Sequence, residues 1–195
     1  MGVLRKYVVA GMIGLLLLGA GCRSSMPSFH IRQDVDFGYI KRVAVLPLNN
    51  LTNVRYAAEA VRDVVISELL ASGLVDVVVP GDVTAAMDTL GIRSVSSLSA
   101  EQIKALGKAL GVQAVVFGSV GEFGMVRMGN ISAPNVTITL MMAETTSGSI
   151  IWSVTTTGTG GGFMARHFGA RSETMSETLL RVVRDAIQTL AEYGS

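Results

Sequence analysis

"NVTITLMMAETTSGSIIWSVTTT", residues 135–157, contains two stretches of alternating apolar and polar residues joined by a short polar segment. In the first stretch every second residue from Val136 to Met142 is apolar, and in the second Trp152 and Val154 alternate with small hydroxyl residues. Alternation with a period of two is typical of strands that bury one face, and the Ser-Gly pair between the stretches is a turn signal. The sequence therefore predicts an antiparallel hairpin.

Strand and helix patterns alternate upstream of this hairpin. The apolar run Val43–Leu46 is unbroken, which favours a strand covered on both faces. From Tyr56 to Ser72, apolar residues recur every three or four positions, as in an amphipathic helix that ends at Gly73. The residues expected on its buried face are Ala58, Val61, Val65 and Leu69.

Two shorter elements are expected next. "LVDVVVP" (74–80) is rich in β-branched residues and predicts a short strand ended by Pro80. Asp82 is expected to cap a helix that stops before Gly91. The residues expected on the buried face of that helix are Val83, Met87 and Leu90.

The strongest helix signal lies in "LSAEQIKALGKALG" (98–111). Ser99 and Gln102 have the spacing of a capping box, and Gly111 stands where a left-handed C-cap belongs. The residues expected on the buried face are Ile103, Leu106 and Leu110.

A strand in "VQAVVFGSVGEF" (112–123) precedes the hairpin, and a helix from about Ser176 to Tyr193 closes the chain. Thr174 and Glu177 are spaced as a second capping box. The buried face of the closing helix is expected to hold Leu180, Val183, Ile187 and Leu190. The order β-α-β-α-α-β-β-β-α predicts an α/β fold, a single-domain sandwich with a mixed β-sheet.

Residues 1–21 have the three regions of a secretory signal peptide. A basic start is followed by the apolar run Val8–Leu18 and then by small residues. The apolar run is shorter than the roughly 20 residues that a membrane-spanning helix needs. A signal peptide is therefore the favoured interpretation, and an uncleaved anchor is the alternative.

Cys22, the one cysteine of the chain, follows this segment directly. A signal that ends in small residues and cysteine resembles the bacterial lipobox, in which the thiol takes a diacylglycerol and the amine exposed by cleavage is usually acylated. Gly19 stands where that motif usually has leucine. Several acyl chains anchor a protein firmly, because each buried methylene contributes about 0.8 kcal/mol. Cys22 is thus the expected lipidation site and membrane contact.

The position after the cysteine carries a sorting signal in enterobacterial lipoproteins, where aspartate retains the protein in the inner membrane. Here it is Arg23, so the resemblance implies the periplasmic face of the outer membrane. Residues 22–36 are polar and predict a lipidated tether, which leaves 37–195 as the periplasmic α/β domain.

The charge balance of the mature chain argues against a nucleic-acid partner. Cleavage after residue 21 reduces the 16 basic residues to 14, against 15 acidic ones. No basic field would remain to attract phosphates, and no cysteine would remain for an internal disulfide.

Patterns that carry catalysis or metal binding are weak. His30 and His167 are far apart, and neither stands beside a cysteine or an acidic cluster, so we expect no metal site. Ser119 lacks the G-x-S-x-G spacing of a nucleophile elbow. The carboxylates that can be placed are expected on the solvent faces of helices: Asp63, Glu68, Asp82, Asp88, Glu101 and Asp185. We expect no enzyme activity.

Two further segments allow functional interpretations. The glycine-rich "TGTGGGF" (157–163) breaks the G-x-G-x-x-G pattern at Phe163 and has no Lys-Ser/Thr, so a loop is expected and no cofactor. Met125 and Met128 beside Phe123 fit either an exposed apolar patch or the core.

Four stretches, taken in order, resemble the CsgG/HfaB family of outer-membrane lipoproteins and its relatives, the LpoB-type penicillin-binding-protein activators and the TolB N-terminal domain. They are "RVAVLPLNNLTN" (42–53), "AAEAVRDVVISELLASG" (57–73), "ALGVQAVVFGSVGEF" (109–123) and "VTITLMMAETTSGSIIWSVTTTGTG" (136–160). The resemblance implies a lipid-tethered periplasmic domain that acts in assembly, as a homo-oligomer or with an envelope protein partner.

The resemblance leaves two functions open. The favoured one is a scaffold of an envelope secretion or export apparatus, and the alternative is an accessory activator of a peptidoglycan synthase. Members that form pores insert two hairpins into the membrane, and each spanning strand needs about 9 to 11 residues. Only Gly124–Asn135 and Gly158–Arg171 are available at the matching places, so we expect no transmembrane hairpins.

Overall fold

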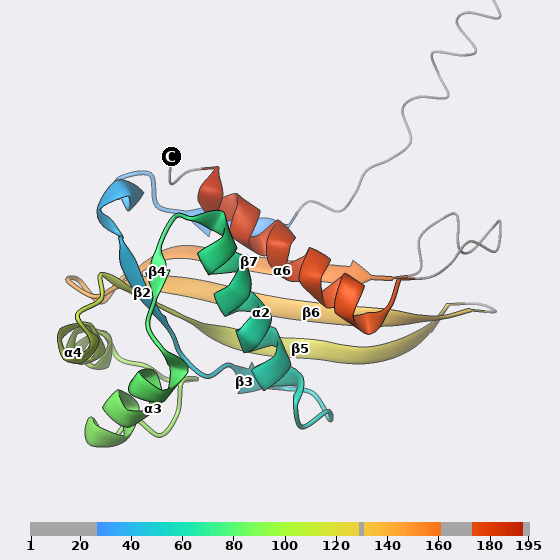
Figure 1. Ribbon diagram of the computed structural model, residues 1–195, viewed down its shortest axis with the longest axis horizontal. Coiled ribbons are helices and arrows are strands. Elements are labelled where there is room, and N and C mark those ends of the chain that lie inside the picture. The colour runs from blue at the N-terminus through green and yellow to red at the C-terminus, as the bar shows by residue number, and fades with distance from the viewer. Residues whose placement is uncertain (1–26, 129–130, 161–172, 193–195) are drawn as a thin grey trace, which may run out of the picture.

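The computed structural model describes residues 27–128, 131–160 and 173–192. These residues form an α/β domain around one mixed seven-stranded sheet in the order β1-β7-β6-β5-β2-β4, with the short β3 paired to β5 (Figure 1). The strands are β1 (Ser28–Ile31), β2 (Arg42–Val45), β3 (Asn49–Asn50), β4 (Asp76–Val77), β5 (Ala114–Met128), β6 (Ile131–Glu144) and β7 (Ile150–Thr159). The helices are η1 (Phe37–Tyr39), α2 (Ala57–Ser72), α3 (Pro80–Thr89), α4 (Ala100–Leu110) and α6 (Met175–Ala191).

The predicted hairpin is confirmed as the antiparallel pair β6 and β7, in which Leu140 lies opposite Val154 and Met142 opposite Trp152. All four of these side chains are buried. The turn between the strands requires glycine at position 148, because its φ is +75° and a Cβ there would lie 2.6 Å from the Cβ of Ala100. The turn is thereby packed against the first residue of α4.

The sheet extends further than the sequence predicts. β5 continues past Phe123 to Met128, and β6 begins at Ile131, so most of the segment expected as an insertion is strand. β7 likewise continues through Gly158 and Thr159, where a loop was expected. A change of register between Val120 and Glu122 marks a β-bulge. The end of β5 lacks a clear alternating pattern because neither of its faces is buried: residues 124–127 are exposed or half-buried.

The sheet separates two apolar cores, and β2 contributes to both. Val43 and Val45 belong to the core under α2 and α6, whereas Ala44 and Leu46 belong to the core under α3 and α4. The prediction of a strand covered on both faces is therefore confirmed. Helices α2 and α6 lie side by side across the same face of the sheet, and the far ends of β5 and β6 extend beyond them (Figure 1).

Helix α2 has the predicted boundaries and ends at Gly73, whose φ is +68°. Val61, Val65 and Leu69 are fully buried as expected. Ala57 is buried and Ala58 is only half-buried, so the first turn is rotated by one residue from the prediction.

Both predicted capping boxes are present. Ser99 Oγ accepts from the Gln102 N–H at 3.2 Å, and the Gln102 side chain accepts from the Ser99 N–H at 3.0 Å. Thr174 and Glu177 make the same pair of bonds at the start of α6. Ile103 and Leu106 are buried in α4 as predicted, while Leu110 is half-buried.

One residue of the closing helix was wrongly placed on its buried face. Leu180 is 37% exposed, whereas Leu179 and Val182 are buried. The buried face of α6 therefore includes Leu179 and Val182 in place of Leu180. Val183, Ile187 and Leu190 are buried as predicted. A buried hydrogen bond ties this helix to the sheet, because the Trp152 indole N–H donates to Thr189 Oγ1 at 3.0 Å.

The predicted strand within 74–80 is present but shorter than expected. Only Asp76 and Val77 pair with β2, and Pro80 begins α3 instead of ending a strand. Proline suits the first helical position because its fixed φ matches the helix. An N–H at this position would have no acceptor within the helix, so proline loses no hydrogen bond there. Asp82 lies in the first turn and is not the cap.

The described part of the predicted tether, residues 27–36, is not a free linker. Ser28–Ile31 form β1, which pairs antiparallel with β7, and Asp36 accepts from the Gly38 N–H at 2.8 Å to begin η1. The prediction failed because an edge strand buries little apolar surface and leaves a weak pattern. Residues 1–21 and Cys22 lie outside the described residues. No helix in the described ranges is long and apolar enough to span a membrane.

Candidate interaction surface

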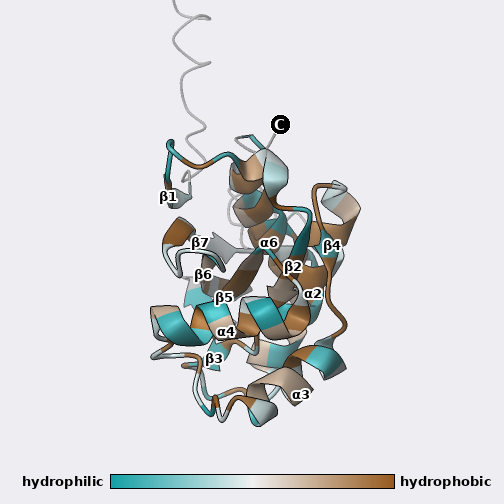
Figure 2. Ribbon diagram, turned by 90° about the vertical axis from the view of Figure 1, so that its left-hand side faces the viewer, coloured by the Kyte–Doolittle hydropathy of each residue, from teal (hydrophilic) through white to brown (hydrophobic). Residues whose placement is uncertain are grey.

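One half of the sheet is covered by helices on a single face. Helices α2 and α6 pack on one side of β5, β6 and β7, while α4 contacts the other side only near the beginning of β5 and the end of β6. Figure 2 views the molecule from the α4 end, with the hydrophilic side of α4 turned outward. The rest of that second face is open to solvent, and we call it the open face; its residues are Ser119, Glu122, Asn135, Thr137, Thr139, Thr155 and Thr157.

Polar side chains of the open face are joined by hydrogen bonds across the strands. The hydroxyls of Thr139 and Thr155 lie 3.0 Å apart, and so do those of Thr137 and Thr157. Thr137 Oγ1 also donates to Glu122 Oε2 at 2.8 Å. Cross-strand pairs of this kind hold side chains in fixed positions and contribute modestly to stability. The open face is therefore flat, polar and ordered.

A groove lies between the open face and the loop that leads into α4. The groove is open to solvent. Leu51 and Ile150 at its sides are 63% and 44% exposed. The other lining residues are Asn49, Val95, Ser96, Ser97, Leu98, Ala100, Ile103, Phe117, Gly118, Ser119, Met141 and Gly148.

The floor of the groove needs glycine at position 118. A Cβ there would lie 2.0 Å from the Thr139 carbonyl oxygen, which is closer than any side chain can approach. Gly118 and Ser119, which the sequence analysis compared with a nucleophile elbow, are thus strand residues. Ser119 lies opposite Thr139 in the β5–β6 ladder.

The groove has the chemistry of a binding surface. None of its described lining residues carries an ionisable side chain; they are apolar, glycine, serine or asparagine. General acid–base catalysis needs a titratable group within reach of the reacting atoms. Exposed apolar side chains beside ordered hydroxyls instead suit the docking of another macromolecule.

Apolar side chains also lie toward the free end of β5, on the face of the sheet that α2 covers. The Tyr56 ring meets the Phe123 ring edge-on, with centroids 5.8 Å apart. Phe123 is buried, whereas Met125, two residues further along the strand, is 61% exposed. Phe123 is therefore part of the core, and Met125 is exposed. The side chain of Met128 lies outside the described residues.

The remaining residues considered for chemistry do not come together. His30 is exposed on the edge strand β1, and His167 lies outside the described residues. Over residues 27–128, 131–160 and 173–192, no three His, Cys, Asp or Glu side chains are grouped as metal ligands.

Four carboxylates make identifiable structural contacts. Glu173 binds Arg181 at 2.8 Å, and this guanidinium lowers the pKa of the Glu173 carboxyl. Glu68 of α2 pairs with Arg184 of α6 at 3.0 Å. Glu144 accepts hydrogen bonds from Ser147 and Tyr39, which lower its pKa. Burial raises the pKa of Asp185. None of these four carboxylates lines the groove.

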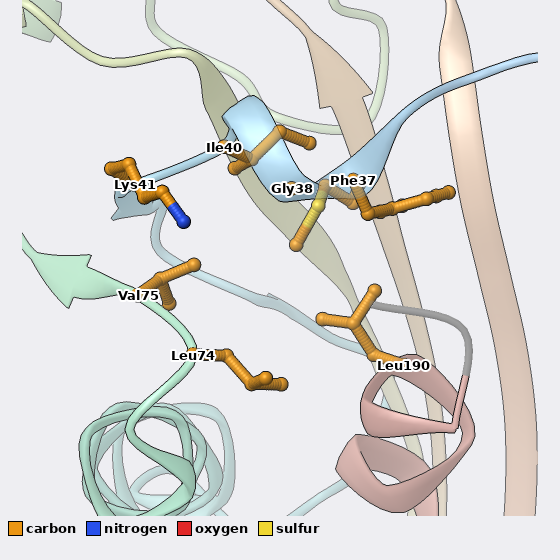
Figure 3. Close-up of a pocket in the computed structure, with 8 residues that line it drawn as sticks. Phe37, Gly38, Ile40, Lys41, Leu74, Val75 and Leu190 are labelled. Carbon is orange, nitrogen blue, oxygen red and sulfur yellow. The ribbon is translucent and has the colours of Figure 1, made fainter. Parts of the chain in front are cut away.

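A second, much smaller hollow opens between η1, the segment before β4 and the end of α6. Figure 3 shows Lys41 and Val75 on one side of it and Phe37 and Leu190 on the other. Lys41 is the one ionisable residue among its described lining residues. The hollow lies at the edge of the core and contains no cluster of reactive groups.

Two solved structures illustrate the fold that this chain shares with other proteins. The PelC dodecamer from Paraburkholderia phytofirmans is 18% identical with a TM-score of 0.58, covering 84% of this chain and 97% of that one. Lipoprotein GNA1162 from Neisseria meningitidis is 16% identical with a TM-score of 0.56, covering 78% of this chain and 99% of that one. At these identities the likeness shows the α/β fold. None of the curated proteins compared matches the chain.

A family model that matches the sequence shows which family the chain belongs to. The model of the peptidoglycan-synthase activator LpoB matches residues 27–157, which is more than half of the chain. The chain belongs to the LpoB family. The match supports the LpoB-type relationship of the sequence analysis. It does not support the CsgG/HfaB assignment, which rested on the order of four short stretches.

Proposed function

We propose that this protein is a lipid-anchored periplasmic accessory protein that binds and activates a peptidoglycan synthase. The observation that carries the proposal is the LpoB family match over residues 27–157. The groove supports it, since a surface without ionisable residues suits regulation by binding rather than catalysis. The main hypothesis of the sequence analysis, an export scaffold, thereby becomes the second candidate.

The binding surface we propose is the groove together with the adjoining open face. Exposed Leu51 and Ile150 would lose water on contact, and burial of apolar surface is the main source of association free energy. The threonine hydroxyls of the open face would then supply hydrogen bonds at the edge of the contact.

The proposed lipid anchor limits the distance from the membrane at which the domain can bind its partner. With lipid on Cys22 and β1 beginning at Ser28, the linking residues 22–27 reach about 20 Å when extended. The domain would stay close to the membrane surface, so the synthase must present its contact region within that distance. This short reach is also the reason to retain a membrane-apposed export scaffold as the second candidate.

The decisive experiment measures glycan polymerisation by the organism's own peptidoglycan synthases with and without this protein. Ile150→Glu and Leu51→Glu place a charge in the groove and are expected to abolish stimulation. Leu70→Glu is the matched control, because Leu70 is a similarly exposed apolar residue on α2. Stimulation that persists in both groove variants would contradict the proposed surface, and no stimulation by the unaltered protein would contradict the activity.

The scaffold candidate predicts a different outcome. Detergent-extracted protein would form closed rings visible by electron microscopy, and synthases would not respond to it. A monomer over a wide concentration range would rule the scaffold out while leaving the activator proposal intact.

The anchor is tested separately. Cys22→Ser is expected to release the protein from membranes or leave it as unprocessed precursor, measured by fractionation and the mass of the chain. A variant that remains membrane-bound and fully processed would contradict lipidation at this residue.

A further inference from the structure

The outer edge of β5, on the side away from β6, is paired along only part of its length. β2 pairs with residues 114–116 and β3 with residues 119 and 120. The last bond on this side runs from the Leu51 N–H to the Val120 carbonyl at 3.0 Å, whereas β5 continues to Met128. Among the described residues, no strand lies beside the rest of this edge, where the sheet extends past the helices (Figure 1).

The neighbouring strand shows which backbone groups of β5 point outward. The Pro134 carbonyl accepts from the Gly160 N–H at 2.8 Å, so the backbone of Pro134 faces the β7 side of β6. Met125 lies opposite Pro134. Because directly opposed residues point their backbone groups either toward or away from each other, the N–H and C=O of Met125 face away from β6. This direction recurs at every second residue, so the backbones of Phe123 and Arg127 also face outward.

Residues 123–127, which we call the free edge, have little protection against pairing with another strand. They include no proline, and Arg127 is their one charged residue. Met125 and Val126 are exposed, and Tyr56 beside them is 63% exposed. An apolar edge strand with unpaired backbone groups is a template for the addition of a further strand.

The side chains of the free edge are complementary to those of a second copy of the same strand. Phe123, Met125 and Arg127 lie on one face of β5, because side chains alternate along a strand. At one end of this row, the Phe123 ring contacts the exposed Tyr56 ring. At the other end Arg127 is exposed and forms no salt bridge with any described residue. An antiparallel second copy reverses the row and brings each arginine to the aromatic pair of the other copy, which is an attractive cation–π arrangement.

We propose that two copies of this chain pair through their free edges as antiparallel strands, with Met125 opposite Met125. Phe123 then lies opposite Arg127 in both halves, and each opposed pair exchanges both of its N–H···O bonds. On the other face of the strand, Gly124 lies opposite the larger Val126. The two Arg127 residues are offset by four residues, about 14 Å along the strand, so they do not repel each other strongly.

The pairing goes beyond the proposed function and does not depend on it. Both copies use the same surface, so association closes at two chains, whereas the ring of the scaffold candidate needs two different surfaces on each chain. Loss of the pairing would leave stimulation of a synthase to be measured separately, and absence of stimulation would leave the dimer in place.

Sedimentation equilibrium of the whole chain carrying Cys22→Ser, in detergent solution, tests the association. This chain is expected to dimerise reversibly. Met125→Pro removes an outward-facing N–H and leaves the ladder to β6 intact, so it should weaken dimerisation about tenfold or more. Met125→Ala keeps the N–H and should weaken it less. A monomer at every concentration, or equal dimerisation of the proline and alanine variants, would overturn the proposal.

The arginine contact is tested by a substitution that leaves the backbone unchanged. Arg127→Gln removes both cation–π contacts and should raise the dissociation constant of the dimer by about fivefold to thirtyfold. Arg93→Gln is the matched control, because Arg93 is an exposed arginine outside the free edge, and it should have no effect. Equal dissociation constants for the two variants would contradict the proposed pairing.

Disulfide trapping tests the register in the same Cys22→Ser chain, where the introduced thiol is the only one. Met125→Cys places the two cysteine Cα atoms about 5.5 Å apart across the dimer, within disulfide range. Val126→Cys is the control, because the two copies of residue 126 are offset by about 7 Å along the strand. The first variant should form the linked dimer about tenfold faster. Equal rates, or a faster control, would overturn the proposed register.

Discussion

The two faces of β6 show how one alternating sequence produces two kinds of surface. Val136, Ile138 and Leu140 point into the core beneath α2 and α6 and are completely buried. Thr137 and Thr139, between them, lie on the open face and bind hydroxyls of β7. Burial holds the first face in place, whereas the second is held by hydrogen bonds of small net stability. The open face can therefore change its chemistry without loss of the fold.

Removal of a large side chain from the covered face is expected to have the greatest effect. Leu140→Ala leaves a cavity and should lower the free energy of unfolding by about 2–5 kcal/mol. Thr139→Ala, one residue away on the open face, should cost about 0.2–1 kcal/mol. Urea denaturation of both variants measures the difference. Similar losses would show that the two faces contribute equally and would contradict the comparison.

The hydrogen bond inside the covered core should have an intermediate effect. Thr189→Val leaves the buried Trp152 indole N–H without its acceptor and should cost about 1–3 kcal/mol. In a Trp152→Phe background, which has no such N–H, the same substitution should cost much less. A double-mutant cycle from denaturation measurements tests this, and purely additive costs would show that the bond itself stabilises nothing.

The wall of the groove depends on a helix cap. Ser99→Ala removes the acceptor for the Gln102 N–H and should destabilise the protein by about 1 kcal/mol. Ser97→Ala in the preceding loop is the control and should be nearly neutral. Hydrogen exchange in the first turn of α4 locates the effect. Equal protection in the two variants would mean that the cap does not order this wall.

The smallest expected effect concerns pH. Hydrogen bonds from Ser147 and Tyr39 lower the pKa of Glu144 in the folded protein below its ordinary value of 4.5. This contribution to stability is present above that value and is lost as the pH falls through the lower folded pKa. Glu144→Gln should therefore reduce the loss of stability below about pH 4.5, as measured by denaturation at several pH values. Identical pH dependence in both proteins would contradict a stabilising role.

Elements with a strong local signal were predictable from the sequence. The hairpin, α2 and both capping boxes combine an apolar period with a turn or cap residue, and all of them are confirmed. The sequence failed where pairing depends on distant residues. β1 has a weak pattern of its own and exists because β7 offers an edge. The ends of β5 and β6 support each other in the same way.

The groove was not predictable for a related reason. Leu51, Ser97, Phe117 and Ile150 come from four separate segments and meet only in the folded chain. The one local signal was Gly118, whose close approach to Thr139 forms the floor.

The pairing of β1 with β7 also sets an order of events during folding. Ser28 can find its place only after Thr155 has been made, because these residues lie opposite each other at the edge of the sheet. Contacts so distant in sequence close slowly. The edge strand β1 is therefore the first of the described strands to be synthesised and among the last to be paired.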